Sequence, residues 1–499
     1  MKKTIFLFLV SVCFTVHAQT KAASRPNIVF IIADDLSSDD LSCYGNKGIK
    51  TPNLQKLAEN GITFNNAYLT AANCSPSRAS IVTGRYPVSN GQTDLTTGAL
   101  PDYNVEFPEF FDGIDFFPEI LQKAGYYTAQ SGKWHLGYHW LKASGPAKKG
   151  FDHTDHKGGE SGAESWTKVL DNRPKNKPFF MWFAAHDPHD PWTAPKVHPI
   201  EDVKVPPYIP DTKYMREQLA AYYDEIHRMD YFIGKMVDKL KEQQVYENTI
   251  IVFVADNGRG FWRSKAHIYD AGMKTPLLVS WPSQIKKNQK SDHLISMVDL
   301  APTFVELAGL EPYGYTFQGR SILPILKDAE SSNVNQYAIS EQNWHGYSSY
   351  YRSVRDVSGY LYIRNGHPEQ SGIGGKAFVD YMVEQNDKGK LTQLQKDLFR
   401  FPRESEELYH YKSDAHQEIN LVTDSKHTKK LNELRNVLDS WQKLTGDRIS
   451  SNEIPDWYQR PYSDEKPKKG VWGDPPGTRN FGVRKYEMKI LELTRFELK

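Results

Sequence analysis

The 499-residue chain is predicted to be an α/β protein with a large, mainly parallel sheet sandwiched between helices, followed by a smaller α+β subdomain. Two observations predict the sheet. Continuous apolar runs, typical of strands buried on both faces, recur along the first part of the chain. Amphipathic helical segments separate them, and this alternation favours a parallel sheet covered on both sides. A third observation is a change of pattern after about residue 331, where short strand-like runs rich in Tyr, Ser and Arg begin.

The main domain is expected to span residues 24–330. Residues 27–33 (NIVFIIA) form the first fully apolar run, which predicts a buried strand. A helix is predicted over 51–59, because a threonine in the capping position is followed by a proline at the first helical position. The segment 214–243 places its apolar residues on one helical face. Further strands are predicted over 126–129, 178–185, 248–255 and 275–279, and further helices over 117–124 and 298–307.

The smaller subdomain is expected to span residues 331–499. The run YLYI over 360–363 predicts a strand, and residues 428–444 predict a helix. The remaining tail is rich in Pro, Gly and Trp.

Composition and charge limit the classes of function. The chain is 39% hydrophobic and 25% charged, as is ordinary for a globular protein. Its formal net charge is +1, so it lacks the broad positive field of nucleic-acid-binding proteins, and we expect no nucleic-acid partner. Any anionic ligand must be bound by a local group of cations.

Residues 1–18 have the pattern of a secretory signal peptide. Two lysines precede an apolar stretch, and a small-residue cleavage site ends at Ala18. The apolar stretch is too short to cross a bilayer, so we expect export to the periplasm or the medium, with no membrane span. Cleavage leaves Cys43 and Cys74, and a disulfide between them stays open as an alternative.

One of these cysteines stands in an unusual stretch, AANCSPSRASIVTGRYP, at positions 71–87. Proline disfavours a helix through its own position, so we expect a helix to begin after Pro76, with Ser77 as its cap. Cys74 then lies just ahead of a helix N-terminus, where an anion is favoured. This position suits a nucleophile or an anion-binding site. A buried structural thiol is the alternative.

Oxygen-bearing side chains follow two of the predicted strands. Asp34 and Asp35 end the first strand, and Asp256 and Asn257 end the strand over 248–255. Either pair alone is more simply explained as a turn. Because both pairs belong at the same edge of one sheet, together they predict a site for Ca²⁺ or Mg²⁺.

Cations and imidazoles occur in the loops at the same edge. A lysine alone is usually a solvated surface charge, and a histidine alone is usually structural. Gathered around a metal and Cys74, they predict an anion site with candidate general acids. The residues concerned are Arg78, Lys133, His135, His186, His189 and Lys265.

Several motifs occur in the order found in one enzyme family. They resemble the signature motifs of the type I sulfatases, members of the alkaline-phosphatase superfamily, and this resemblance implies an alkaline-phosphatase-like fold. The motifs are Cys74-Ser75-Pro76-Ser77-Arg78 with Thr83-Gly84-Arg85, Ala33-Asp34-Asp35, Gly132-Lys133-Trp134-His135-Leu136-Gly137, Asp187-Pro188-His189, Asp256-Asn257-Gly258, Lys265-x-x-x-Tyr269, and Glu407-Leu408-Tyr409 followed by Glu418-x-Asn420-Leu421.

The resemblance implies a modified nucleophile and a metal. Cys74 would be oxidised to formylglycine by a formylglycine-generating or sulfatase-maturating enzyme, and the aldehyde hydrate would attack the sulfur of a sulfate ester. Residues 24–330 would be the catalytic domain, and residues 331–499 would complete the substrate cleft. Calcium, in preference to magnesium, would be bound by Asp34, Asp35, Cys74, Asp256 and Asn257.

The resemblance also assigns roles to the cations and imidazoles. Arg78 would stabilise the hydrate, and His135 would stabilise the nucleophile. His189 would protonate the leaving group, whereas His186 would be structural. The side chains in contact with the sulfate would be Lys133, His135, His189 and Lys265. After Tyr269, many relatives have Glu-Gly-Gly-x-Arg, but this chain has Asp-Ala-Gly-Met-Lys.

The substrate implied by the resemblance is a sulfated glycan. Motifs such as Ser340-Glu341-Gln342 are similar to the N-sulfoglucosamine sulfohydrolase branch, which also includes bacterial enzymes for algal polysaccharides such as ulvan. We expect an exo-acting O-sulfatase, with N-sulfoglucosamine hydrolysis as the alternative. A phosphonate or phosphodiester hydrolase and a non-enzymatic glycan receptor are more distant alternatives. The candidate sugar contacts are Trp262, Arg263, Trp344 and His345.

Overall fold

The computed structural model describes residues 25–93, 114–136, 144–147, 149–345, 348–369, 373, 378–447 and 492–494. The predicted signal peptide lies outside these residues. Within them the larger sheet has eight strands in the order β4-β3-β5-β1-β6-β7-β2-β8. The strands are β1 (Asn27–Ala33), β2 (Gly61–Tyr68), β3 (Tyr127–Gly132), β4 (His153–Asp155), β5 (Phe179–Ala184), β6 (Thr249–Ala255), β7 (Leu277–Ser280) and β8 (Gln289–Ser296).

The sheet is mainly parallel, as predicted. β1 pairs in parallel with β5 and β6, whereas β7 runs antiparallel to β6 and β2. The fully apolar sequence of β1 is explained by two cores. Ile28, Phe30 and Ile32 face one core, and the alternate residues face the other.

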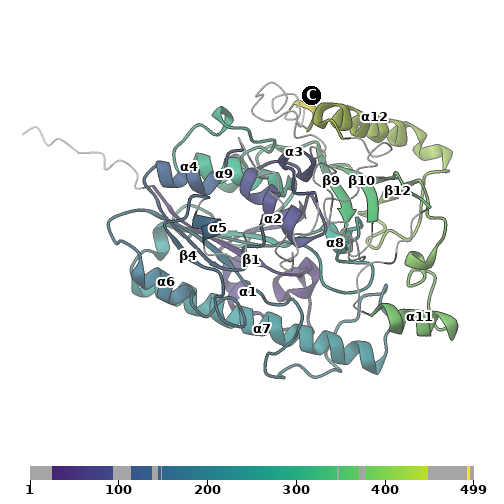
Figure 1. The fold of residues 1–499 in the computed structure, drawn as a ribbon, viewed down its shortest axis with the longest axis horizontal. Helices are drawn as coiled ribbons and strands as arrows, with labels where there is room; N and C mark the ends of the chain where they lie inside the picture. The colour runs from purple at the N-terminus through teal and green to yellow at the C-terminus, as the bar shows by residue number, and fades with distance from the viewer. Residues whose placement is uncertain are drawn as a thin grey trace, which may run out of the picture.

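Helices cover both faces of this sheet (Figure 1). The core on one side is closed by α1, α6 and α7, and the core on the other by α2, α4 and α9. The helices are α1 (Pro52–Glu59), α2 (Cys74–Thr83), α3 (Pro87–Asn90), α4 (Phe117–Lys123), α5 (Ser144–Ala147), α6 (Trp166–Asn172), α7 (Lys213–Glu242), α8 (Asp270–Met273), α9 (Leu300–Leu307), α10 (Leu323–Lys327), α11 (Val379–Asp387) and α12 (Thr428–Thr445).

A smaller antiparallel sheet forms the C-terminal subdomain, with the strand order β12-β11-β10-β9. Its strands are β9 (Tyr337–Trp344), β10 (Ser348–Asp356), β11 (Tyr360–Asn365) and β12 (Glu406–His410). α12 packs against one face, where Leu434, Leu438 and Trp441 meet Val354 and Leu408. The other face turns toward the larger domain, since Ser340 donates to the carbonyl of Leu69 at 2.7 Å.

The sequence analysis missed β2. Its sequence, GITFNNAY, has two asparagines in place of a continuous apolar run, yet the strand is paired on both sides by β7 and β8. β2 matters to the site because the chain passes from its end to Cys74.

Within the described residues, no helix combines the length and the apolar character needed to cross a membrane.

A cluster of aromatic rings under α4 and α9 should contribute strongly to stability. Phe304 is fully buried, and its ring centroid lies 5.3 Å from that of Phe30 and 5.0 Å from that of Phe117. Phe304→Ala should lower the free energy of unfolding by about 3–5 kcal/mol, because it leaves a cavity in a packed core. Urea titration would measure the loss. The control Phe401→Ala removes a ring that is 69% exposed and should change little; equal losses would contradict this assignment.

Candidate active site

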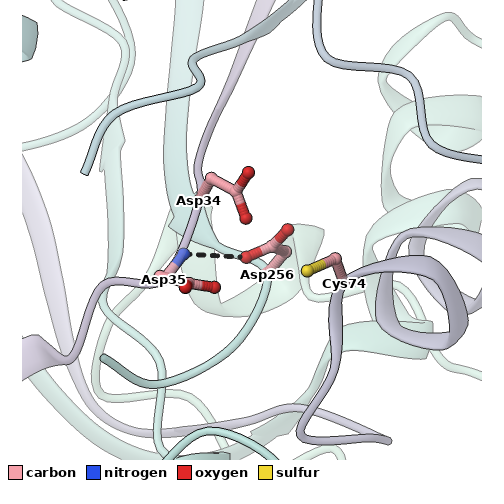
Figure 2. Close-up of side chains that lie close together, drawn as sticks. All are labelled: Asp34, Asp35, Cys74 and Asp256. Carbon is pink, nitrogen blue, oxygen red and sulfur yellow. Dashed lines mark hydrogen bonds between the residues drawn. The ribbon is translucent and has the colours of Figure 1, made fainter. Parts of the chain in front are cut away.

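The site lies at the carboxyl ends of β1 and β6. Ala33 and Ala255 are paired in register, so the residues that follow them emerge side by side. Figure 2 shows the carboxylates of Asp34, Asp35 and Asp256 converging, with the thiol of Cys74 beside them. The sequence predicted this convergence from the two strand ends.

These four side chains can surround a single ion. One ligand atom from each of Asp34, Asp35, Cys74 and Asp256 lies within 4.8 Å of the others, and all four residues are buried. The backbone N–H of Asp35 donates to Asp256 Oδ1 at 3.2 Å, which links the two strand ends. Such a cluster of carboxylates has the chemistry of a hard cation site.

Two buried oxygen atoms in the cluster show whether it is suited to a metal ion. Asn257 donates its amide nitrogen to Asp35 Oδ1 at 2.7 Å and to the carbonyl of Gly258 at 2.8 Å. Its Oδ1 is buried and accepts no hydrogen bond from the described residues, and the same is true of Asp34 Oδ1. Buried oxygens without partners are costly, and a divalent cation would satisfy both. The residues therefore fit a metal with oxygen ligands.

Cys74 is the first residue of α2, so the expected helix start was wrong. The helix begins three residues before the expected cap, Ser77, and the extended residue Asn73 precedes it. Pro76 is accommodated because it stands in the first helical turn, where its missing N–H is not needed. Cys74 still lies at a helix N-terminus, as expected. Cys43 and Cys74 are both free, so the alternative of a disulfide between them is wrong.

Three cations face the carboxylates, and two of them, Arg78 and Lys133, are buried. Arg78 Nε lies 2.7 Å from Asp256 Oδ2, Lys133 pairs with Asp34, and Lys265 Nζ lies 2.6 Å from Asp35 Oδ1. Arg78 also donates to the carbonyl of Lys133 at 2.9 Å, while its Nη2 is buried with no acceptor among the described residues. The three cations therefore lie together around the carboxylates and Cys74.

These pairs determine how the carboxyl groups ionise. Burial disfavours the charge of Asp34, but Lys133 and the other nearby cations hold its pKa well below the usual value. The pKa of Asp35 is lowered in the same way, with Lys265 as its main partner. Burial and the neighbouring charge of Asp34 raise the pKa of Asp256 to about 6, against the opposing effect of Arg78. Burial also raises the pKa of the Cys74 thiol to about 12.

The predicted histidines occupy different positions. His189 is about one-third exposed, its Nε2 lies 3.8 Å from Asp35 Oδ2, and its Nδ1 donates to the carbonyl of Asp190 at 2.5 Å. His135 is buried in the turn that follows β3, two residues after Lys133. His186 Nε2 lies 3.0 Å from the carbonyl of Lys157 and thus contacts the neighbouring loop.

Two of the expected sugar contacts are packing residues. Trp262 is buried and donates to the carbonyl of Gln395 at 3.0 Å, and buried Arg263 pairs with Asp397 at 3.0 Å. Sequence reasoning could not exclude them, because both partners lie more than 130 positions away. The side chain of Trp344 lies outside the described residues.

His345, the fourth candidate sugar contact, borders the site. Burial lowers its pKa to about 3, and the nearby charges that act on it belong to Lys265, Asp35 and His189. Its Nδ1 is buried and has no hydrogen-bond partner among the described residues. His345 thus remains a candidate for contact with a ligand.

Gly260 is a feature that the sequence analysis missed. A Cβ atom at this position would lie 3.0 Å from Asp35 Oδ2, so glycine keeps the space beside that carboxylate open. The spacing Gly258-Arg259-Gly260, directly after the metal motif, was the available signal.

The fold and the site define a class of protein. A buried cysteine at a helix N-terminus lies beside a carboxylate cluster and three cations, all at the carboxyl edge of a mainly parallel sheet. This arrangement is typical of a metal-dependent enzyme acting on a compact anionic group. The profile of the family described as Sulfatase matches residues 26–310, more than half of the chain, and that of the N-sulphoglucosamine sulphohydrolase C-terminal domain matches residues 258–364. The chain belongs to the sulfatase family and is a sulfuric ester hydrolase.

Individual relatives agree with this family. An ulvan-active sulfatase of Formosa agariphila is 30% identical over 86% of this chain and 76% of its own length. The N-sulphoglucosamine sulphohydrolase of Homo sapiens is 29% identical over 85% of this chain and 91% of its own length. A structure solved with its substrate, D-glucosamine-2-N,6-O-disulfate, shares the fold with a TM-score of 0.63 at 23% identity, covering 87% of this chain and all of that one.

The carboxylate cluster should bind a divalent cation and thereby stabilise the fold. At a concentration of 100 times the dissociation constant, bound Ca²⁺ would add about 2.7 kcal/mol to the free energy of unfolding. Thermal melts with and without Ca²⁺, and with Mg²⁺ in parallel, should show an increase in melting temperature that Asp256→Ala abolishes. The control Asp238→Ala removes an exposed carboxylate from α7 and should keep the increase. An increase that survives in Asp256→Ala would exclude the cluster as the binding site.

Proposed function

We propose that this sulfatase removes sulfate from a sulfated polysaccharide or its oligosaccharides outside the cytoplasm, with Cys74 converted to formylglycine and Ca²⁺ bound beside it. The observation that carries the proposal is the position of Cys74 at the start of α2, next to three carboxylates and three cations. A plain metal site would not need a side chain held at a helix N-terminus in this way. The signal-like sequence of residues 1–18 supports export.

The proposal assigns specific residues to the two groups that it adds. Formylglycine, made from Cys74 by a sulfatase-maturating enzyme, would supply a hydrated aldehyde as the nucleophile. Calcium would be held by Asp34, Asp35, Asp256 and the unpartnered Oδ1 of Asn257. Arg78 has a free Nη2 donor directed to no protein acceptor among the described residues, so it can hold an oxygen at position 74.

The chain's own side chains bind the sulfate and move the proton. Lys133 and Lys265 supply positive charge beside Asp34 and Asp35, where they would neutralise the sulfate oxygens. His189 is the more exposed imidazole. Since its Nδ1–H donates to the carbonyl of Asp190, Nε2 is the atom that can hold a proton for the leaving oxygen. His135 is placed deeper, on the side of Lys133, and would stabilise the nucleophile.

The substrate is inferred from the relatives and from one residue of the C-terminal subdomain. Two relatives are ulvan-active sulfatases, and on that basis an exo-acting O-sulfatase is proposed. The human relative that acts on N-sulphoglucosamine makes N-sulfate hydrolysis the second candidate. His345 is proposed to contact the sugar, because its imidazole has an unpartnered, buried nitrogen near Lys265 and His189.

The nucleophile can be tested by mass spectrometry. Purified active enzyme should contain a peptide in which Cys74 is lighter than cysteine, and its mature N-terminus should follow Ala18. Cys74→Ala should abolish sulfate release, whereas Cys43→Ala, which changes the other free cysteine, should leave activity intact. Full activity in a preparation that holds only the thiol form would contradict the formylglycine mechanism, and an intact N-terminus on exported protein would contradict cleavage.

The substrate can be tested with a panel of fragments. Ulvan, carrageenan, fucoidan and heparan oligosaccharides are incubated with the enzyme, and released sulfate is followed by chromatography, with Cys74→Ala as the blank. We expect release from the terminal O-sulfated sugar of short ulvan-type fragments, since a site built from buried residues admits a chain end more readily than its middle. Release from N-sulfoglucosamine alone would favour the second candidate. Release from intact polymers alone would exclude exo action.

A further inference from the structure

The loop that follows β6 carries Lys265 into the site. Lys265 Nζ lies 2.6 Å from Asp35 Oδ1, and its backbone N–H donates to the carbonyl of Arg259 at 3.1 Å. The next residue, Ala266, donates its N–H at 2.8 Å to the carbonyl of Ala72, two residues before Cys74. The path of this loop therefore sets where the ammonium group stands relative to the carboxylates and to position 74.

The loop has a strained backbone on both sides of Lys265. Arg263 has φ of 59° and Ala266 has φ of 68°, the left-handed region that residues other than glycine rarely adopt. Each such residue carries backbone strain. This conformation persists only because contacts around the loop stabilise it. Those contacts therefore determine the position of Lys265.

One set of contacts holds Arg263. Its guanidinium is buried and donates to Asp397 at 3.0 Å, to the carbonyl of His416 at 2.8 Å and to the carbonyl of Gln417 at 3.0 Å. It also lies over the ring of Tyr269, 3.7 Å from the ring centroid. The three acceptors all belong to the C-terminal subdomain.

A second set of contacts holds the other end of the segment. Tyr269 Oη donates to Glu407 at 2.9 Å and accepts from Arg403 at 2.8 Å. Asp270 pairs with Arg355 of β10 at 3.0 Å, where α8 meets the smaller sheet (Figure 1). Both ends of the strained segment are thus held by residues that lie beyond position 330 in the sequence.

We propose that the C-terminal subdomain positions Lys265 for sulfate binding through this clamp, defined as Arg263 and Tyr269 of the loop with Asp397, Arg403 and Glu407 of the subdomain. The inference rests on the proposed function, in which Lys265 contacts the sulfate. The clamp residues are positioning residues, because their side chains contact one another and other groups of the C-terminal subdomain, such as Arg400 and Tyr409. The subdomain thereby contributes to binding of the sulfate group, and not only to recognition of the sugar.

β12 provides a matched control. Glu406 and Glu407 are neighbours on opposite faces of this strand, and each accepts a hydrogen bond from a tyrosine of another segment; Glu407 also accepts one from Tyr409 at 2.5 Å. Tyr269 binds Glu407 on the face toward the catalytic domain, whereas Tyr362 donates to Glu406 at 2.5 Å on the face that carries α12. Tyr269→Phe and Tyr362→Phe therefore each delete one phenol hydroxyl bound to one glutamate of the same strand.

The test uses inorganic sulfate as a competitive inhibitor of glycan desulfation by the full-length enzyme. Tyr269→Phe should raise both the inhibition constant for sulfate and KM about tenfold, with a smaller change in kcat. Tyr362→Phe should alter neither constant. In a Lys265→Ala background, Tyr269→Phe should have no further effect on sulfate inhibition, because the residue it positions is gone. Glu407→Gln should reproduce the change and serves as the second variant if Tyr269→Phe folds poorly.

Two results would overturn the clamp. One is an unchanged inhibition constant in both Tyr269→Phe and Glu407→Gln. The other is an equal loss in the presence and absence of Lys265, which would mean that the contacts only stabilise the fold. A wild-type enzyme that releases no sulfate from any glycan would contradict the proposed function instead, so the two failures can be told apart.

Discussion

The burial of several negative charges at one sheet edge is the constraint on which the rest of the structure depends. Parallel pairing of β1 with β6 places Asp34, Asp35 and Asp256 within a few ångströms of one another and out of contact with water. Each unpaired carboxylate would cost several kcal/mol in such a place. The cost is offset by cations from three different segments, the loop after β3, helix α2 and the loop after β6, and these segments are thereby drawn together around Cys74.

The smaller subdomain also buries paired charges where it meets the larger domain. Alternation along β12 directs Glu407 inward and Glu406 outward, so one strand serves both the interface with the catalytic domain and the contact with α12. At the interface, Glu407, Asp397 and Arg403 extend the pattern of paired buried charges away from the site. The loop that bears Lys265 lies between the carboxylates of the site and these charged residues of the interface. Its contacts with both explain how its strained backbone conformation is maintained.

Much of the site could be predicted, because its ligands follow from local rules. A continuous apolar run fixes a buried strand, and a parallel sheet brings the residues after its strands to one edge. Asp34 and Asp256 could therefore be placed together although they lie far apart in the sequence. The start of α2 was misjudged, since a proline was read as a barrier when it stands in the tolerant first turn.

Other features depend on partners that no local pattern reveals. β2 has a half-polar sequence and is a strand because β7 and β8 pair with it. The sequence made Arg263 a candidate sugar contact, but its hydrogen-bond acceptors lie in the C-terminal subdomain. The histidine after β9 could be named as a candidate, but its nearness to Lys265 required the fold of both domains.

If Cys74 is converted to formylglycine as proposed, the depth at which it is buried also sets an order of events in the life of the chain. Only 1% of this residue is exposed, and Ser75, Ser77 and Arg78 beside it are fully covered. An enzyme that alters the cysteine and reads these neighbours can bind them only while the segment is still extended. Modification and folding would therefore compete in time, and a molecule that folds first would keep an inaccessible thiol for as long as it stays folded.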